Sequence, residues 1–294
     1  MTTVVDPDPA AGRPEPTPDG SARRRRGLRF PSRQDSTNVQ LGVAVLWLSL
    51  IVLLPLAAIL WTSAQGGWEA FWSAVTTPSA LASFRVTLTI SVVVTLVNAV
   101  FGLLIAWVLV RDEFPFKRAV DAIIDLPFAL PTIVASLVLL SLYGPGSPAG
   151  IHIQHTGWGV GLALAFVTLP FVVRAVQPVL LEVDREVEEA AASLGANNLT
   201  IFIRVILPAL APALLSGAGL AFSRAIGEFG SIVLIGGAIP GKTEVSSQWI
   251  RTLIENDDPV GAAAISIVLL VISFGVLFAL RYLGARAARR EEAR

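Results

Sequence analysis

Cysteine is absent from the 294 residues, histidine occurs only twice, and charged residues make up 15 % of the chain. Without cysteine, disulfides, thiolate catalysis and zinc–thiolate sites are excluded. The two histidines, His152 and His155, lie in a segment flanked by Gly150 and Gly157, so no metal site is expected. Soluble domains carry about 25 % charged residues, and the shortage of charge therefore argues against a soluble globule.

Long apolar runs take the place of the missing charge. Hydrophobic residues make up 54 % of the chain, and the mean hydropathy is +0.69. A helix needs about 20 apolar residues to cross a membrane, so the uncharged run 126–173 is too long for one crossing, and turn residues at 143–148 and Gly157 divide it. The sequence therefore predicts an all-α integral membrane protein with six transmembrane helices, at residues 39–62, 86–110, 122–142, 159–181, 212–235 and 260–280.

Lysine and arginine are distributed unequally between the segments that join these spans. With the N-terminus in the cytoplasm, 17 of the 22 basic residues lie on the cytoplasmic side, and only Arg85, Lys242 and Arg251 lie outside. Cytoplasmic loops carry the excess of Lys and Arg, so both termini are predicted to be cytoplasmic. Residues 285–294 are predicted to be a short tail. Residues 1–38 are predicted to be a disordered Arg-rich tail. The alternative is that this tail binds a membrane lipid headgroup or a partner.

One polar loop, residues 182–208, interrupts the apolar pattern on the cytoplasmic side. It contains the stretch EAAASLG, from Glu189 to Gly195. Around the start of this stretch, a mainly acidic polar face lies opposite an apolar stripe at helical spacing; the polar face is Arg185, Glu186, Glu188 and Glu189, and the stripe is Val187, Ala190, Ala191 and Leu194. Such a helix is expected to offer a docking point to a soluble partner. The alternative is an amphipathic helix lying on the membrane, but helices of that kind more often carry Lys and Arg on the polar face.

The residues after this stretch predict how it ends. Gly195 permits a turn with positive φ or a close backbone approach, and Asn197 and Asn198 suit the cap of a second short helix at 199–205. Pro208 and Pro212 are expected to break the backbone before the next span.

Residues 236–243 (GGAIPGKT) satisfy the pattern G-x-x-x-x-G-K-[ST] of a nucleotide-binding loop. That loop needs a parallel sheet, a following helix and a metal-binding Asp, and only 51 residues remain after it. The predicted topology also places it outside the cytoplasm. We interpret it as an extracytoplasmic turn in which Lys242 contacts an incoming partner or substrate. An enzyme would rest on this pattern alone.

Ionisable residues inside a membrane are costly and indicate functional sites. Arg224 and Glu228 on the fifth predicted span are spaced i, i+4, so they are expected to pair, either as a structural or gating ion pair or with Arg224 as an anion contact. Arg174, near the inner end of the fourth span, is expected to reach water or to line a cytoplasmic exit. Asp121 and Asp125 are expected to face the aqueous interior or the coupling region.

Two prolines, Pro127 and Pro131, fall in the third predicted span. Each removes a backbone donor and is expected to kink the helix. The kink is either packing geometry or a hinge for alternating access.

The cytoplasmic loop resembles the EAA loop of ATP-binding-cassette (ABC) importer permeases. That motif consists of Glu-Ala-Ala, three residues, Gly, nine residues, an aliphatic residue, one residue and Leu-Pro. Glu189, Gly195 and Pro208 hold its spacings, with Val205 in place of the usual Ile. The resemblance covers roughly residues 39–283. Four stretches resemble the sulfate/thiosulfate permeases of the T-subunit kind: DLPFALPT (125–132), LPFVVRAVQPVL (169–180), SRAIGEFG (223–230) and GKTEVS (241–246).

The resemblance implies a type I importer fold with a cytoplasmic coupling helix, in a bacterial plasma membrane. It implies that the chain is half of a pore and no catalyst itself, moved by alternating access. The implied partners are a dimer of ABC ATPase subunits, which use the ATP and Mg, a homologous second permease subunit, an extracytoplasmic sulfate-binding protein and membrane lipid, with no nucleic acid. The residues that it assigns to ATPase coupling are Glu189, Ala190, Ala191, Gly195, Leu207 and Pro208. Candidate pathway or gate residues are Arg224, Glu228, Arg174, Pro127 and Pro131.

Two alternatives remain at this point. Molybdate permeases share the architecture and part of the motifs, so molybdate, tungstate or another oxyanion is the alternative cargo. A secondary transporter would need its own coupling site and no ATPase.

Overall fold

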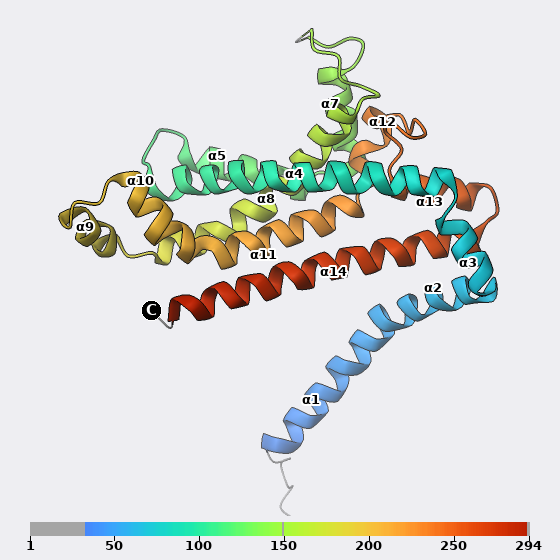
Figure 1. The fold of residues 1–294 in the computed structure, drawn as a ribbon, viewed down its shortest axis with the longest axis horizontal. Helices are drawn as coiled ribbons and strands as arrows, with labels where there is room; N and C mark the ends of the chain where they lie inside the picture. Colours follow the sequence, from blue (N-terminus) through green and yellow to red (C-terminus); the bar gives the residue numbers. More distant parts are fainter. Residues whose placement is uncertain (1–32, 149, 293–294) are drawn as a thin grey trace, which may run out of the picture. The chain divides into compact units, whose positions relative to one another are not determined.

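The computed structural model describes residues 33–148 and 150–292, and within those ranges the chain is helical without any strand (Figure 1). The helices are α1 (Arg33–Leu48), the π-helix η1 (Ser49–Leu53), α2 (Leu54–Gln65), α3 (Gly67–Val75), α4 (Pro78–Arg111), α5 (Lys117–Ile124), α6 (Leu126–Ala129), α7 (Thr132–Tyr143), α8 (Gly157–Glu182), α9 (Arg185–Ser193), α10 (Asn198–Ile201), the π-helix η2 (Phe202–Ile206), α11 (Leu207–Ile226), the 3₁₀-helix η3 (Gly230–Ile232), α12 (Val233–Gly236), α13 (Ser246–Glu255) and α14 (Pro259–Glu292). The predicted all-α class is confirmed.

The chain divides into two compact units, residues up to Val52 and Leu53–Arg294. In the first unit, the described side chains from Gln40 onward are almost all exposed, which suits an apolar surface facing lipid. Most of the predicted disordered tail, residues 1–32, lies outside the described residues, but residues 33–38 belong to α1. The predicted second tail from 285 onward is also partly helical, since α14 continues to Glu292.

Five helices in the described part are long and apolar enough to cross a membrane. They run through predicted spans one, two, four, five and six: Gln40–Gln65, Pro78–Arg111, Gly157–Glu182, Asn198–Ile226 and Pro259–Arg286. The third predicted span, 122–142, is wrong as a continuous helix, because it consists of parts of α5 and α7 with α6 between them.

Proline explains the interruption. Leu130 has φ −83° and ψ 133°, and the residue before a proline is pushed into this extended region by the proline ring. Pro131 therefore ends α6 at Ala129 instead of kinking one helix. Pro127 occupies the first turn of α6, where its missing N–H costs nothing.

The fifth span also differs from its predicted bounds, 212–235. It begins earlier, at Asn198, and stops at Ile226, because Gly227 and Gly230 are poor helix formers on either side of the buried Glu228. The expected break at Pro208 and Pro212 is wrong. The π-helix η2 comes just before Pro208, which lies in the first turn of α11. The wider turn of η2 accommodates the N–H group that proline lacks, so the helix continues.

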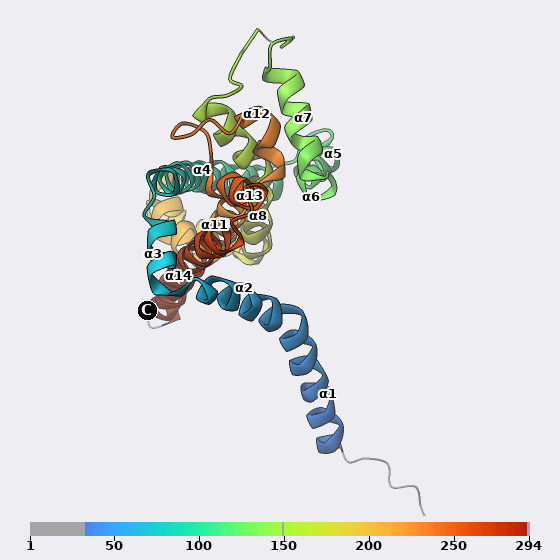
Figure 2. The ribbon, with the colours of Figure 1, turned by 90° about the vertical axis from the view of Figure 1, so that its right-hand side faces the viewer.

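Within the second unit, α11 packs against α4, α8 and α14. The view in Figure 2 shows α11 between these helices. Backbones approach closely: a Cβ at Gly217 would lie 2.8 Å from the Cβ of Ala175 on α8, as expected where small residues let membrane helices pack. Asn98 on α4 adds interhelical hydrogen bonds to Ala165 O (3.0 Å) and to Thr168 Oγ1 (2.9 Å).

Candidate functional site

Helix α9 stands apart from the packed helices, since none of its residues is buried. Its first turn is capped by Asp184, whose carboxylate accepts a hydrogen bond from Glu186 N at 2.9 Å. Glu189, Ala190 and the adjacent Leu194 are exposed, and Leu194 keeps 90 % of its surface. The helix therefore presents acidic and apolar side chains outward together.

The far end of α9 is a Schellman motif. Gly195 has φ +88°, its N–H donates to Ala192 O (2.9 Å), and Ala196 N donates to Ala191 O (3.1 Å). A Cβ at Gly195 would meet nothing within 4 Å. Conformation, and not space, therefore requires glycine at this position, as the positive-φ prediction anticipated.

The chain then enters α10, which Asn197 caps through Thr200 N at 2.8 Å. The predicted second helix at 199–205 is therefore α10 and η2, which run on into α11. Leu207 and Pro208 are half-buried in the first turn of α11. Leu207 and Pro208 are therefore the motif residues that belong to a span. The other motif residues belong to α9 and the turn after it: Glu189, Ala190, Ala191 and Gly195.

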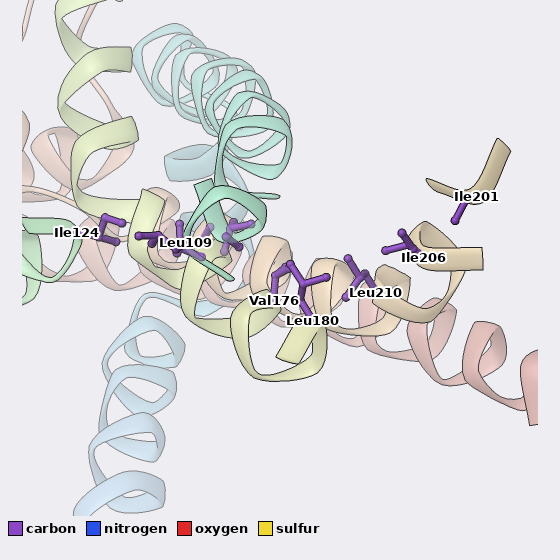
Figure 3. Close-up of a cluster of buried hydrophobic side chains, with 11 residues drawn as sticks. Leu109, Ile124, Val176, Leu180, Ile201, Ile206 and Leu210 are labelled. Carbon is purple, nitrogen blue, oxygen red and sulfur yellow. The ribbon is translucent and has the colours of Figure 1, made fainter. Parts of the chain in front are cut away.

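A hydrophobic cluster joins the segment from α9 to η2 to the spans (Figure 3). Leu109 of α4, Val176 and Leu180 of α8, and Ile206 and Leu210 around η2 are all buried in it. Ala191 packs against this cluster. The segment is therefore exposed on one side and anchored in the core on the other.

Sequence patterns did not single out Arg111, the last residue of α4. Its guanidinium forms an ion pair with Glu188 of α9 and is only 10 % exposed. A basic residue ending one apolar run, followed later in the chain by an acidic loop on the same side, was the available signal.

Arg174 of α8 is the centre of a second polar cluster. Its Nε and Nη2 donate to the two carboxylate oxygens of Asp125 (2.8 and 2.7 Å), and its Nη1 donates to Asp121 Oδ1 (2.7 Å) and Gln177 Oε1 (2.6 Å). Arg174 stays 30 % exposed, so the expectation that it reaches water remains a prediction, now with two acidic partners beside it. Arg174 fastens α5 and the start of α6 to α8.

The Arg224–Glu228 pair is present, with 2.7 Å between Nη2 and Oε2. Glu228 is 1 % exposed and lies beyond the end of α11, whereas Arg224 is in its last turn and 37 % exposed. Oε1 of Glu228 accepts a hydrogen bond from Ser231 N (2.8 Å). The Oε2 contact is close but lacks the alignment of a hydrogen bond, so charge attraction holds it.

The GGAIPGKT loop is not built to cradle phosphate. The backbone N–H groups of Lys242, Thr243 and Glu244 all donate to Ile239 O at 3.0 Å. A phosphate loop directs such N–H groups at its ligand, and no strand precedes this loop in the described part of the chain. Within the described residues, no three His, Cys, Asp or Glu side chains gather where they could hold a metal ion.

Comparison with known proteins agrees with this architecture. Among solved structures, a bacterial alginate ABC transporter in complex with its alginate-bound periplasmic protein superposes with a TM-score of 0.69, at 16 % identity over 85 % of this chain and 94 % of that one. The MetNI methionine ABC transporter gives a TM-score of 0.55 at 20 % identity over 70 % and 95 %. These likenesses concern the fold.

Sequence relatives are closer. The "Sulfate transport system permease protein CysT" of Salmonella typhimurium is 44 % identical over 259 residues, which is 86 % of this chain and 94 % of that protein. The protein of the same name from Synechocystis is 46 % identical over 255 residues, 84 % and 89 % respectively. Residues 98–289 match the family described as "Binding-protein-dependent transport system inner membrane component". The chain therefore belongs to this family of multi-pass ABC importer permeases.

Proposed function

We propose that the chain forms half of the membrane pore of an ATP-driven importer for sulfate or thiosulfate. The relatives named as sulfate permeases share about 44 % of their residues with it over most of both chains. The single observation that carries the mechanism is α9, an exposed helix capped at both ends and anchored to the core of the spans. An exposed helix that is capped and anchored in this way suits the transmission of movement from a soluble ATPase to the spans.

The proposed partners follow from that role. A dimer of cytosolic ABC ATPases docks on α9 and uses ATP and Mg, a homologous second permease subunit completes the pore as a heterodimer, and an extracytoplasmic binding protein delivers the anion.

Both termini and α9 are then cytoplasmic, in a bacterial plasma membrane. An impermeant thiol reagent tests this orientation, because the chain has no cysteine of its own. A Ser193→Cys variant labelled in intact cells would contradict it.

Alternating access then requires a ligand that distinguishes two states. ATP binding favours the outward-open arrangement, in which the Arg224–Glu228 pair faces the incoming anion. Arg224→Ala should impair uptake while the binding protein's affinity for sulfate is unchanged. Unaltered uptake would remove Arg224 from the pathway.

The cargo is tested by competition. Uptake of labelled sulfate by the reconstituted complex should be inhibited by unlabelled sulfate and thiosulfate and resist an equal concentration of molybdate. Stronger inhibition by molybdate than by sulfate would assign the chain to the other oxyanion.

A further inference from the structure

Helix α4 ends against the upstream arm of the loop that carries α9. Arg111 pairs with Glu188 of α9, and the same Nη2 lies 3.5 Å from Val183 O, just before α9. Its guanidinium carbon stands 5.6 Å from the centre of the Trp107 ring, one helical turn back on α4. Arg111 is therefore held from three sides, and a charge only 10 % exposed needs such partners.

The same turn of α4 also meets the downstream arm. Trp107 packs edge-to-face on Phe202 of η2, with 5.6 Å between ring centres and 78° between ring planes. A cavity of about 370 Å³, bounded in part by Trp107, Glu188 and Phe202, separates α9 from η2. The two arms are thus linked to each other through the end of α4.

At its other end, α4 holds α13. Thr87 Oγ1 accepts a hydrogen bond from Ser246 N (2.8 Å) and contacts Ser246 Oγ (3.1 Å), while Ser83 Oγ lies 3.2 Å from that hydroxyl. Ser247 then donates to Glu228 O at 2.7 Å. The polar contacts of this end therefore reach the backbone of Glu228, the residue whose buried carboxylate pairs with Arg224.

Between these ends α4 is uninterrupted. Its 34 residues contain proline only in the first turn, and at 1.5 Å per residue such a helix is about 50 Å long. Figure 1 shows α9 and α10 near one end of α4 and α13 near the other. By contrast, α5 to α7 are separate helices and α11 is preceded by a π-turn, so these segments transmit an axial push less directly.

We propose that Arg111 and Trp107 are positioning residues that connect movements of α9 to α13 through α4. This proposal rests on the proposed function, because it assumes that an ATPase moves α9. Arg111 makes the charge link to the upstream arm and Trp107 the apolar link to the downstream arm. The polar contacts of Ser83 and Thr87 then pass the displacement to α13 and the Arg224–Glu228 pair.

The test measures α13 while nucleotide acts on the partner ATPase. In the complex assembled in nanodiscs with cysteine-free partner subunits, Ile254→Cys provides a single thiol on an exposed position of α13. A non-hydrolysable ATP analogue should change its rate of modification by a thiol reagent. Adding Arg111→Met should reduce that nucleotide response at least fivefold, which corresponds to a typical coupling energy, while the ATPase stays bound.

Lys117→Met is the matched control, because Lys117 pairs with the exposed Glu113 of the adjoining linker (2.8 Å) and not with α9. Arg111→Lys keeps the charge but loses the planar stacking on Trp107, so an intermediate response is expected. It also serves if Arg111→Met fails to assemble.

A full nucleotide response in both Arg111 variants would overturn the connection. A native complex in which α13 ignores nucleotide but ATP still drives uptake would also overturn it, with the proposed function intact. A native complex whose uptake needs no ATP would instead overturn the proposed function.

Discussion

At the scale of single residues, the backbone of Gly195 carries the clearest requirement. Its φ of +88° places it in the left-handed region, and open space surrounds the position where a Cβ would stand. Any effect of replacing it therefore reports backbone strain, and the size of the new side chain matters little.

We expect Gly195→Ala to reduce ATP-driven uptake about fivefold, because an L-residue in this conformation costs about 1 kcal/mol. Gly195→Asn should retain more than half of the activity, since Asn tolerates the left-handed region. The measurement is uptake by the reconstituted complex at equal permease content. Equal losses in the two variants would contradict the conformational account.

Glu244 gives a prediction for pH. It is 5 % exposed in the loop before α13, and burial raises the pKa of its carboxyl. The folded protein thus keeps this proton at pH values where the unfolded chain has lost it, so its contribution to stability declines as pH rises from the ordinary pKa through the raised one.

Glu244→Gln should therefore leave the Tm nearly unchanged at pH 4 and raise it at pH 7. Thermal unfolding in nanodiscs at both values measures this difference. A Tm shift of Glu244→Gln that is the same at both pH values would refute the role of burial.

At the scale of elements, apolar runs predicted the existence of the spans but not the bounds of the third and fifth. Pro131 showed where the third segment changes, yet whether a proline bends or ends a helix depends on what holds the next segment. Here Ser136 Oγ accepts hydrogen bonds from Leu234 N (3.1 Å) and Ile235 N (3.3 Å), which fastens α7 to α12. Such contacts join residues about 100 positions apart, and no local pattern contains them.

The Arg174 cluster gives a prediction at this scale. Arg174→Lys loses the two-pronged contact with Asp125, and because these side chains are partly exposed we expect a loss of about 1 kcal/mol. Amide hydrogen exchange in residues 117–130 should then accelerate about fivefold. Arg251→Lys, in an exposed pair on α13, is the control and should leave that exchange unchanged. Unchanged exchange in Arg174→Lys would show that the cluster does not fasten α5.

At the scale of the whole molecule, the sequence predicted the membrane class, the exposed helix from its acidic face and glycine, and the Arg224–Glu228 pair from its spacing. It did not indicate the Arg111–Glu188 pair or the polar cluster around Arg174, because each joins charged residues about 50 or more positions apart. Long-range polar contacts were therefore the part of the site that patterns missed.

The proposed function requires that movement driven by ATP in the partner ATPase is transmitted to the pore through α9. The most direct measurement is uptake of labelled sulfate into proteoliposomes that contain the complex, with ATP on the ATPase side and binding protein on the other. We predict accumulation only with ATP, and its loss in Glu189→Lys while the pore subunit remains inserted. Accumulation without ATP, or full ATP-driven uptake in Glu189→Lys, would contradict the account.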